Sequence, residues 1–243
     1  MSKQRVTQRV KKRFTSEVNI IDFQPYLPQK KQRVQLSPRN TNQELYVRKL
    51  QDDAKSIILA IGPAGTGKTM LAVQNGIRLF QEGKVDKIIV TRPAVSVDED
   101  LGFLPGTLNE KMAPWTRPIF DVLGEYYQQK DIAKMLEDGT IEISPLAYMR
   151  GRTFKNAYII ADEMQNATQN QMKMLLTRLG ENSKMVVTGD LNQADRLKDN
   201  GLIDFIGKVE GRKLSHIDVV RFDSCDIERH NAVKEVLDLY GDD

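Results

Sequence analysis

The chain has 243 residues, of which 40% are hydrophobic and 28% charged, as in globular proteins large enough to bury a sizeable core. The sequence has no apolar run long enough to cross a membrane, and its basic N-terminus lacks the apolar segment of a signal peptide. A single cysteine excludes an intramolecular disulfide, and together with two widely spaced histidines it makes no zinc site. We therefore expect a cytoplasmic protein with one large domain and no membrane contact.

The net charge of +3 conceals a strong asymmetry along the chain. Residues 1–40 carry ten lysines and arginines against two acidic residues, a net charge of +8, which leaves −5 for residues 41–243. Three prolines and the lack of a sustained helical or strand period predict that residues 1–40 form a partly disordered arm. A basic arm is typical of proteins that bind RNA or DNA, but a solubilising tail has the same composition, and charge alone leaves both readings open.

Apolar periodicity predicts alternating strands and helices in residues 41–243. We expect strands at 55–61, 87–95, the beginning of 140–154, 156–164, 183–190 and 214–222. We expect helices at 42–53, 69–80, 119–139 in two pieces, 168–180, 201–211 and 226–241. In the first helix Leu45, Val47 and Leu50 are candidate core positions, and Gly180 is expected to end the helix that precedes it. This alternation favours an α/β fold in which helices cover both faces of a mostly parallel sheet.

Residues 96–118 carry several prolines and glycines and are expected to be irregular. Segments of this length in a compact domain are usually functional or partly helical. The sequence leaves open whether this segment is a lid, an oligomer contact or a guide for a nucleic-acid strand. Its aromatic residues Phe103 and Trp115 could stack on bases or hold the segment to the domain.

Residues 62–69, with the sequence GPAGTGKT, match the phosphate-binding loop G-x-x-x-x-G-K-[ST] between a predicted strand and a predicted helix. The glycines permit a tight turn in which backbone N–H groups point at phosphate oxygens. Lys68 can reach the β- and γ-phosphates, and Thr69 can offer its hydroxyl to Mg²⁺. The residues expected to bind the nucleotide are Gly62, Pro63, Ala64, Gly65, Thr66, Gly67, Lys68 and Thr69.

Two carboxylates, Asp162 and Glu163, end the apolar strand at 156–164. In open α/β sheets, ligands bind at the carboxyl ends of the strands. Asp162 can hold Mg²⁺ there, and Glu163 can orient and deprotonate an attacking water, which makes it a candidate catalytic base. The alternative is that Asp162 only caps a helix. A phosphate loop about 90 residues earlier favours the catalytic interpretation.

Polar residues also end the strand at 183–190, where Thr188 and Asp190 are followed by Gln193. A polar group at this place can hydrogen-bond the γ-phosphate or the attacking water, and Gln193 is the expected sensor of the bound nucleotide. The alternative is a capped turn that opens the next segment.

Further upstream, Gln43 could read adenine through two hydrogen bonds, or it could be an exposed surface glutamine.

Six arginines lie near predicted strand ends or in helices that could face this site. One of them could act on the γ-phosphate as an arginine finger, either in cis or from a neighbouring subunit. Taken singly, each is more typical of a surface or ion-pair residue. The candidates are Arg92, Arg150, Arg152, Arg178, Arg221 and Arg229.

Taken together, these motifs resemble those of a known family, the PhoH family of ATPases. The matching segments occur in the family's order and are GPAGTGKT, TRPAV, LGFLPGTLNEKMAPWTRPIFDVL, IEISPLAYMRGRTF, YIIADEMQNAT, MKMLLTRLGENSKMVVTGDLNQ and the RH of DIERH. The resemblance covers about residues 40–241. It implies a RecA-like P-loop fold related to the first motor domain of superfamily 1 helicases, with ATP and Mg²⁺ as ligands.

The resemblance also implies roles for single residues. Lys68 and Thr69 match the residues for phosphate and Mg²⁺, and Asp162 and Glu163 match the metal and catalytic carboxylates. The resemblance further implies an adenine reader, a γ-phosphate sensor and a candidate arginine finger, which are Gln43, Gln193 and Arg229 respectively. One departure is Met164, which stands in a small-residue position of the family and is tolerated if it faces the core.

A helicase of the two-domain type needs a second RecA-like domain to complete the ATP cleft. Only about 53 residues follow residue 190, too few for such a domain. We therefore expect a homo-oligomer, such as a hexameric ring, that supplies an arginine from a neighbour, with RNA as the favoured nucleic-acid partner. The predicted activity is Mg²⁺-dependent ATP hydrolysis. An ATP-regulated nucleic-acid-binding protein with little turnover and an oligomeric RNA helicase remain alternatives.

Overall fold

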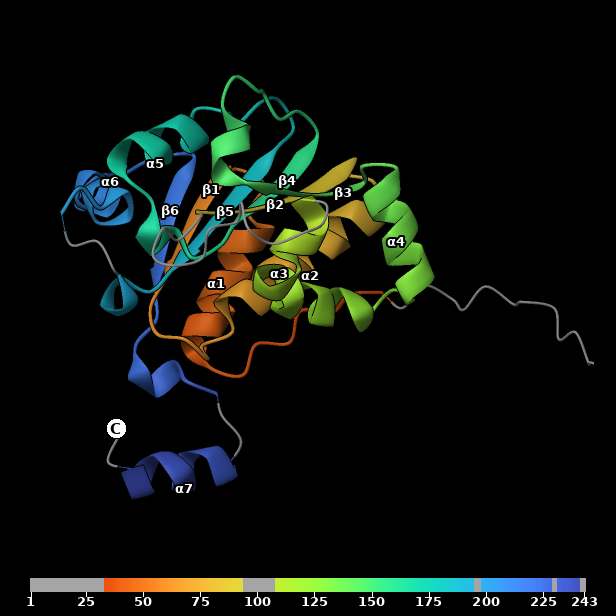
Figure 1. The fold of residues 1–243 in the computed structure, drawn as a ribbon. Helices are drawn as coiled ribbons and strands as arrows, with labels where there is room; N and C mark the ends of the chain where they lie inside the picture. Colours follow the sequence, from red (N-terminus) through yellow and green to blue (C-terminus); the bar gives the residue numbers. More distant parts are fainter. Residues whose placement is uncertain (1–32, 94–107, 195–197, 229–230, 241–243) are drawn as a thin grey trace, which may run out of the picture. The chain divides into compact units, whose positions relative to one another are not determined.

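The computed structural model describes residues 33–93, 108–194, 198–228 and 231–240 (Figure 1). Its centre is a six-stranded sheet in which neighbouring strands pair in parallel. The strands are β1 (Ile57–Ile61), β2 (Lys87–Arg92), β3 (Ile141–Pro145), β4 (Ala157–Ala161), β5 (Lys184–Gly189) and β6 (Ile217–Arg221). Their spatial order is β3-β2-β4-β5-β1-β6, so β5 lies between β1 and β4. Each of the six predicted strand regions contains one of these strands.

The described α-helices are α1 (Thr41–Gln51), α2 (Lys68–Gln81), α3 (Leu108–Gly124), α4 (Gln129–Glu137), α5 (Gln169–Leu176), α6 (Gly201–Val209) and α7 (Asn231–Tyr240). Short 3₁₀ turns follow several strands, namely η1 (Leu146–Met149), η2 (Met164–Asn166), η3 (Leu191–Gln193) and η4 (Ser224–Asp226). The helix predicted in two pieces corresponds to the end of α3 and to α4, with a break between them.

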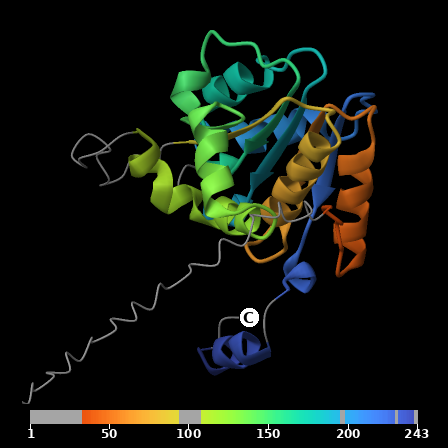
Figure 2. The same cartoon turned by 90° about the vertical axis from the view of Figure 1, so that its right-hand side faces the viewer.

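Both faces of the sheet are buried, which is why its strands read as nearly continuous apolar runs. On one face, alternate strand residues such as Tyr158 and Val186 pack with buried residues of α1, α2, α3 and α4. On the other face, Ile159 and Val187 pack with buried residues of α5, α6 and η1. Figure 2 shows α1 and α2, drawn in orange to gold, side by side on the first face.

Helix α2 approaches β4 very closely. A Cβ atom added at Gly76 would lie 2.7 Å from Cδ1 of Tyr158, so only glycine fits this position without movement of the ring. The neighbouring Asn75 donates a hydrogen bond of 3.1 Å from Nδ2 to the hydroxyl of Tyr158. This packing fixes the helix that follows the phosphate loop relative to the strand that ends in Asp162.

The prediction that residues 96–118 are irregular is wrong for residues 108–118, because α3 begins at Leu108 and contains two prolines. The possibility that the segment is partly helical is confirmed. Proline disfavours helix interiors, since it lacks an N–H group and its ring clashes with the preceding turn. Here the buried Ile119 and Leu123 pack into the core of the first face, and this packing outweighs the local preference.

The roles suggested for Phe103 and Trp115 stay predictions. Residues 94–107 and the side chain of Trp115 lie outside the part of the chain that the structure describes.

Two finer predictions about helices are also wrong. Gly180 does not end α5, which stops before it. A Cβ atom there would instead lie 2.5 Å from the carbonyl oxygen of Phe154, so glycine is required by close backbone approach. In α1, Val47 and Leu50 are buried as predicted, whereas Leu45 is 40% exposed.

Residues 33–40 fall within the predicted arm but lie against the domain. The side chain of Val34 is buried, and its N–H donates to Oε1 of Gln81 at 3.4 Å. Asn40 caps α1 by accepting a hydrogen bond from the N–H of Gln43. The beginning of α1 is therefore tied to the chain segment that precedes it.

The phosphate-loop sequence connects β1 to α2, and the acidic residues follow β4 within an all-parallel sheet. This arrangement confirms the predicted α/β fold of the P-loop, RecA-like type.

Met164 is buried in the second-face core, so its departure from the family pattern is accommodated as expected. Among the described residues, no helix combines the length and apolarity needed to cross a bilayer.

Candidate nucleotide-binding site

The phosphate loop joins the carboxyl end of β1 to the first turn of α2. Gly62 has a φ of +148° and passes so close to the chain after β6 that an added Cβ would lie 2.3 Å from the carbonyl oxygen of Phe222. Gly67 precedes α2 in the left-handed conformation, with a φ of 79°, and no side chain caps the helix. The loop therefore leads into an uncapped helix N-terminus, the structure at which proteins commonly bind phosphate.

The side chain of Lys68 folds back onto this loop. Its Nζ donates to the carbonyl oxygens of Gly62 at 2.6 Å and Pro63 at 2.5 Å, and to Oγ1 of Thr66 at 3.2 Å. Burial lowers the pKa of Lys68, and nearby carboxylates act in the opposite direction. Those carboxylates belong to Asp190, Glu163 and Asp162.

Donors from two elements, α2 and β5, converge on one carboxylate oxygen of Asp162, which follows β4. The hydroxyl of Thr69 in α2 donates to Oδ1 of Asp162 at 2.7 Å, and the hydroxyl of Thr188 in β5 donates to the same atom at 2.5 Å. Asp162 is 7% exposed. A carboxylate beside a hydroxyl is a set of hard oxygen donors, which Mg²⁺ prefers, so these residues fit a Mg²⁺ site.

The next residue, Glu163, has a left-handed backbone with φ 54° and ψ 40°. This conformation is uncommon for residues other than glycine, and it concentrates at functional sites. Its carboxylate accepts a hydrogen bond of 2.5 Å from Nε2 of Gln165. Oε1 of Gln165 in turn accepts from the N–H of Asp190 at 3.1 Å.

Gln165 is only 2% exposed and is the site residue that sequence reasoning missed. Its signals in the sequence are its place two residues after Glu163 and its inclusion in the segment YIIADEMQNAT, which resembles the family pattern. A glutamine at that spacing is also compatible with an exposed turn, so the pattern alone does not reveal the bridge that its side chain makes.

The structure brings Gln193 to the same edge of the sheet, at the end of η3. Its side chain is exposed, and its N–H donates to the carbonyl of Asp190 at 3.1 Å. The carboxylate of Asp190 accepts from the N–H of Asn192 at 3.0 Å, so the capped turn that we considered as an alternative is present. The sensor role of Gln193 stays a prediction.

Gln43 is 1% exposed, so the alternative of an exposed surface glutamine is wrong. Its Oε1 accepts from the N–H of Arg39 at 2.8 Å, and its Nε2 donates to the carbonyl of Thr66 in the phosphate loop at 3.1 Å. Gln43 therefore lies against the loop from the side of α1. Its role as the adenine reader stays a prediction.

The segment after β6 also returns to the phosphate loop. The carboxylate of Asp226 accepts from Nδ2 of Asn42 at 2.8 Å, which ties η4 to α1. Two residues later, the N–H of Glu228 donates to the carbonyl of Gly65 at 3.1 Å. Arg229 lies outside the described residues, so its role as an arginine finger stays a prediction.

Arg152, Arg178 and Arg221 are among the candidate arginines that have partners within the domain. The guanidinium of Arg152 donates two hydrogen bonds to the carboxylate of Glu142. Arg178 donates to the carbonyl of Arg152 at 3.2 Å. Arg221 pairs with Glu210 at 2.9 Å. These contacts favour the surface or ion-pair interpretation for Arg152 and Arg221, and a structural contact with the backbone for Arg178. The remaining described candidates are the exposed Arg150 and the half-buried Arg92.

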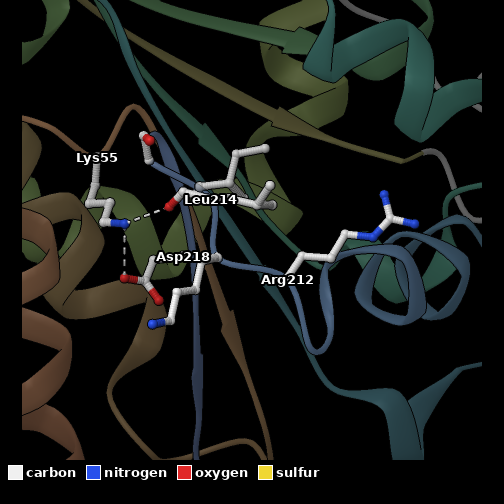
Figure 3. Close-up of a pocket in the computed structure, with 7 residues that line it drawn as sticks. Lys55, Arg212, Leu214 and Asp218 are labelled. Atoms are coloured by element: carbon white, nitrogen blue, oxygen red, sulfur yellow. Dashed lines mark hydrogen bonds and ion pairs between the residues drawn. The ribbon is translucent and has the colours of Figure 1, made fainter.

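A pocket of about 380 Å³ lies at the opposite edge of the sheet, at the amino ends of β1 and β6 (Figure 3). Lys55 contributes to its wall and donates from Nζ to the carbonyl of Leu214 at 3.0 Å. The same Nζ lies 3.5 Å from a carboxylate oxygen of Asp218. The charge of this lysine is thus balanced locally, and the pocket is separate from the phosphate-loop residues.

The fold and the converging residues together define a protein with the P-loop NTPase fold. The family described as "PhoH-like protein" matches residues 35–241, and the chain belongs to this family. A PhoH-like protein of Mycobacterium bovis is 45% identical over 210 residues, which make up 84% of this chain and 58% of that protein. Protein PhoH of Escherichia coli strain K12 is 43% identical over 208 residues, 83% of this chain and 57% of that protein. The predicted resemblance is confirmed.

The chain therefore spans less than two thirds of the length of these relatives. Among solved structures, the SWI2/SNF2 ATPase core of Sulfolobus solfataricus in complex with dsDNA is similar over 80% of this chain and 46% of that chain. The TM-score is 0.44 and the sequence identity 17%. A likeness of this degree carries no functional conclusion, and the fold rests on the strand order and the phosphate loop.

Proposed function

We propose that this chain is a Mg²⁺-dependent ATPase built on a single RecA-like domain. The observation that carries the proposal is the hydrogen bond of 2.7 Å between the hydroxyl of Thr69 and the carboxylate of Asp162. It joins the first turn of the helix after the phosphate loop to the strand that ends in two carboxylates. A phosphate site beside ligands for a divalent cation is what hydrolysis of a nucleoside triphosphate requires.

In this proposal the backbone N–H groups of the loop and the ammonium of Lys68 bind the phosphates. Lys68 leaves the carbonyl oxygens of Gly62 and Pro63 to do so, and its charge is favoured by the carboxylates nearby. Thr69 and Asp162 hold Mg²⁺. When bound, the ion neutralises charge on the phosphate oxygens, as in other phosphoryl-transfer sites.

Glu163 is the proposed general base. Its carboxylate takes a proton from the attacking water, whose oxygen then forms a bond to the γ-phosphorus while the bond to the β-phosphate oxygen breaks. The products are ADP and inorganic phosphate. Gln193 hydrogen-bonds the γ-phosphate or the water from the end of the next strand, and Arg229 from a neighbouring copy is the proposed arginine finger.

The preference for ATP is assigned to Gln43. In the structure its amide uses one N–H for Thr66 and one lone pair for Arg39. A primary amide has two N–H groups and two lone pairs, so a second donor and a second acceptor are left for the edge of adenine. The position of Gln43 beside the loop supports this role.

We further propose that hydrolysis is coupled to nucleic acid, with RNA favoured, and that the protein assembles into a homo-oligomer. The charge of +8 on residues 1–40 supports a polyanion partner. Exposed apolar side chains on α7 support assembly, since such a stripe is more stable when covered. They belong to Val233, Val236 and Leu239.

The test is release of inorganic phosphate from ATP by the purified full chain, with Mg²⁺ or with EDTA, and with RNA, DNA or neither. We expect turnover that requires Mg²⁺ and that falls by roughly a hundredfold or more in Lys68→Ala, as when a single charge-stabilising donor is lost. Lys155→Ala is the control, because this lysine is 63% exposed and precedes the amino end of β4. Equal turnover in Lys68→Ala and wild type would contradict the proposal.

The same preparation tests the alternatives. ATP binding without phosphate release in any condition would favour an ATP-regulated nucleic-acid-binding protein. ATP-dependent strand displacement by an assembly would favour a helicase. A mass measurement in solution with ATP and Mg²⁺ decides whether a neighbour is present to supply an arginine, and a strictly monomeric protein would contradict a finger in trans.

A further inference from the structure

The side chain of Gln165 occupies a place that the proposed mechanism does not use. It is 2% exposed, yet both ends of its amide are hydrogen-bonded. Nε2 donates to the carboxylate of Glu163, and Oε1 accepts from the N–H of Asp190. The amide therefore bridges the carboxyl ends of β4 and β5, the two strands that carry the proposed base and the proposed sensor.

The surroundings of Gln165 fix this bridge. Its own carbonyl accepts a hydrogen bond of 2.7 Å from Nδ2 of Asn200, the residue that caps α6. On the other side, a Cβ atom at Gly189 would lie 3.1 Å from Oε1 of Gln165 and 2.5 Å from Leu202. The last residue of β5 is thus a glycine at the place where the side-chain amide of Gln165 lies closest to the strand, and a larger residue would crowd that amide. A buried polar side chain held from several sides has one orientation, because its alternatives leave polar atoms without partners.

The base that receives this bond needs such support. The backbone of Glu163 is left-handed, a conformation that costs free energy for a residue with a side chain and persists only when the surroundings enforce it. The donor must also be neutral and must present an N–H, because a carboxylate at this place would repel Glu163 and an apolar side chain could not donate. An amide meets both requirements, and its oxygen meets the N–H of Asp190 at the same time.

We propose that Gln165 is the positioning residue of the catalytic base. It holds the carboxylate of Glu163 in the orientation that receives a proton from water, and it sets that orientation relative to the strand end that carries Asp190 and Gln193. Gln165 acts only through Glu163 and does not touch the nucleotide. This inference rests on the proposed ATPase function.

The first variant is Gln165→Met, which keeps the length and bulk of the side chain but removes both hydrogen bonds. We expect kcat to fall roughly 10- to 100-fold, the effect of losing one hydrogen bond to a charged group. We expect the Kd for a non-hydrolysable ATP analogue to stay within about twofold of the wild-type value, since no contact to the nucleotide is lost. Gln165→Glu keeps an acceptor for Asp190 but loses the donor to Glu163, and we expect a similar fall in kcat.

A matched control is Gln74→Met. Gln74 in α2 is also a buried glutamine, at 8% exposure, and its Nε2 donates at 3.1 Å to the hydroxyl of Tyr126, which lies in the turn between α3 and α4. The Gln74→Met substitution makes the same chemical change as Gln165→Met, but away from the strand ends. We expect it to lower the thermal midpoint of unfolding while kcat stays within about twofold of wild type.

A double-mutant cycle separates positioning from a general loss of structure. In single-turnover measurements, adding Gln165→Met to Glu163→Gln should cause no further fall, because Gln165 has lost the group through which it acts. The proposal is overturned if the two effects multiply, or if folded Gln165→Met and Gln165→Glu both turn over as fast as wild type. A wild-type protein without turnover would overturn the ATPase function itself, and this inference with it.

Discussion

The ring of Tyr158 in β4 lies where the side chain of any residue larger than glycine would stand at position 76 of α2, 2.7 Å from an added Cβ. This contact sets the separation between the helix that follows the phosphate loop and the strand that leads to Asp162. The hydrogen bond from Asn75 to the tyrosine hydroxyl fixes the same pair of elements along their length.

Replacing this glycine should therefore destabilise the fold. We expect Gly76→Ala to lower the free energy of unfolding by roughly 1–3 kcal/mol, because the new methyl overpacks the core. Gly207→Ala is the matched change within α6, where an added Cβ meets nothing within 4 Å. It should raise the free energy of unfolding by up to about 1 kcal/mol through helix propensity. Urea denaturation of the two variants measures both changes in the free energy of unfolding. If both substitutions changed it in the same direction, this explanation of Gly76 would be contradicted.

The Mg²⁺ ligand set gives a second prediction. In Asp162→Asn, the affinity for an ATP analogue in the presence of Mg²⁺ should fall roughly 10- to 100-fold, because the amide cannot replace the carboxylate charge. In EDTA the affinity of the variant should match that of wild type, since the loop still binds the phosphates. Fluorescence titration with and without Mg²⁺ provides the measurement. An equal loss in EDTA would mean that Asp162 supports the loop and not the metal.

Lys184 makes stability depend on pH. It lies at the start of β5, and its Nζ donates to the carbonyls of Leu50 and Asp52, both at 2.8 Å, at the C-terminal end of α1. Burial lowers the pKa of Lys184 from 10.5 to about 8. Between these two values the unfolded chain binds the proton more strongly than the folded protein does.

In that window the Lys184 contribution to the free energy of unfolding should rise with pH, because the folded protein no longer has to bury a charged amine. Asp53 and Asp52 raise the pKa of Lys184 in the folded protein and so narrow the pH range between its folded and unfolded pKa values. Arg78 and Lys84 lower that pKa and so widen the range. The difference in unfolding free energy between wild type and Lys184→Met, measured from about pH 7 to about pH 10, should grow in favour of wild type. A flat difference across this range would show that Lys184 stays charged in the fold.

The basic arm gives a fourth prediction. Deleting residues 1–32 should weaken RNA binding and flatten the dependence of log affinity on log salt, by up to about 0.7 for each phosphate contact that is lost. Filter binding across a salt series measures the slope. ATP hydrolysis without RNA should be unchanged, because the proposed site residues lie outside the deleted segment. An unchanged slope would assign RNA binding to the domain and leave the arm without this role.

The sequence was sufficient for the parts of the site that depend on spacing. The loop at 62–69 and the carboxylates at the end of β4 follow from a motif, a strand and a helix, and the parallel sheet makes their ends meet. The pattern could not give Gln165, because its role depends on the direction of one buried amide. The pattern also could not predict the beginning of α3. Proline has a low helix propensity, but packing on the sheet outweighs that propensity there.

The strand order has a consequence for how the protein is made. Ile57 of β1 pairs with Met185 of β5 on one side and with Ile217 of β6 on the other. Both partners follow far downstream in the chain, so these pairings close long loops and are slow to form. During synthesis from the N-terminus, the phosphate-loop sequence leaves the ribosome before both partner strands of β1, and β1 has no strand to pair with until residues 184–189 emerge. Nucleotide affinity should therefore arise late in synthesis, and a nascent chain stalled before β5 would be expected to bind no ATP.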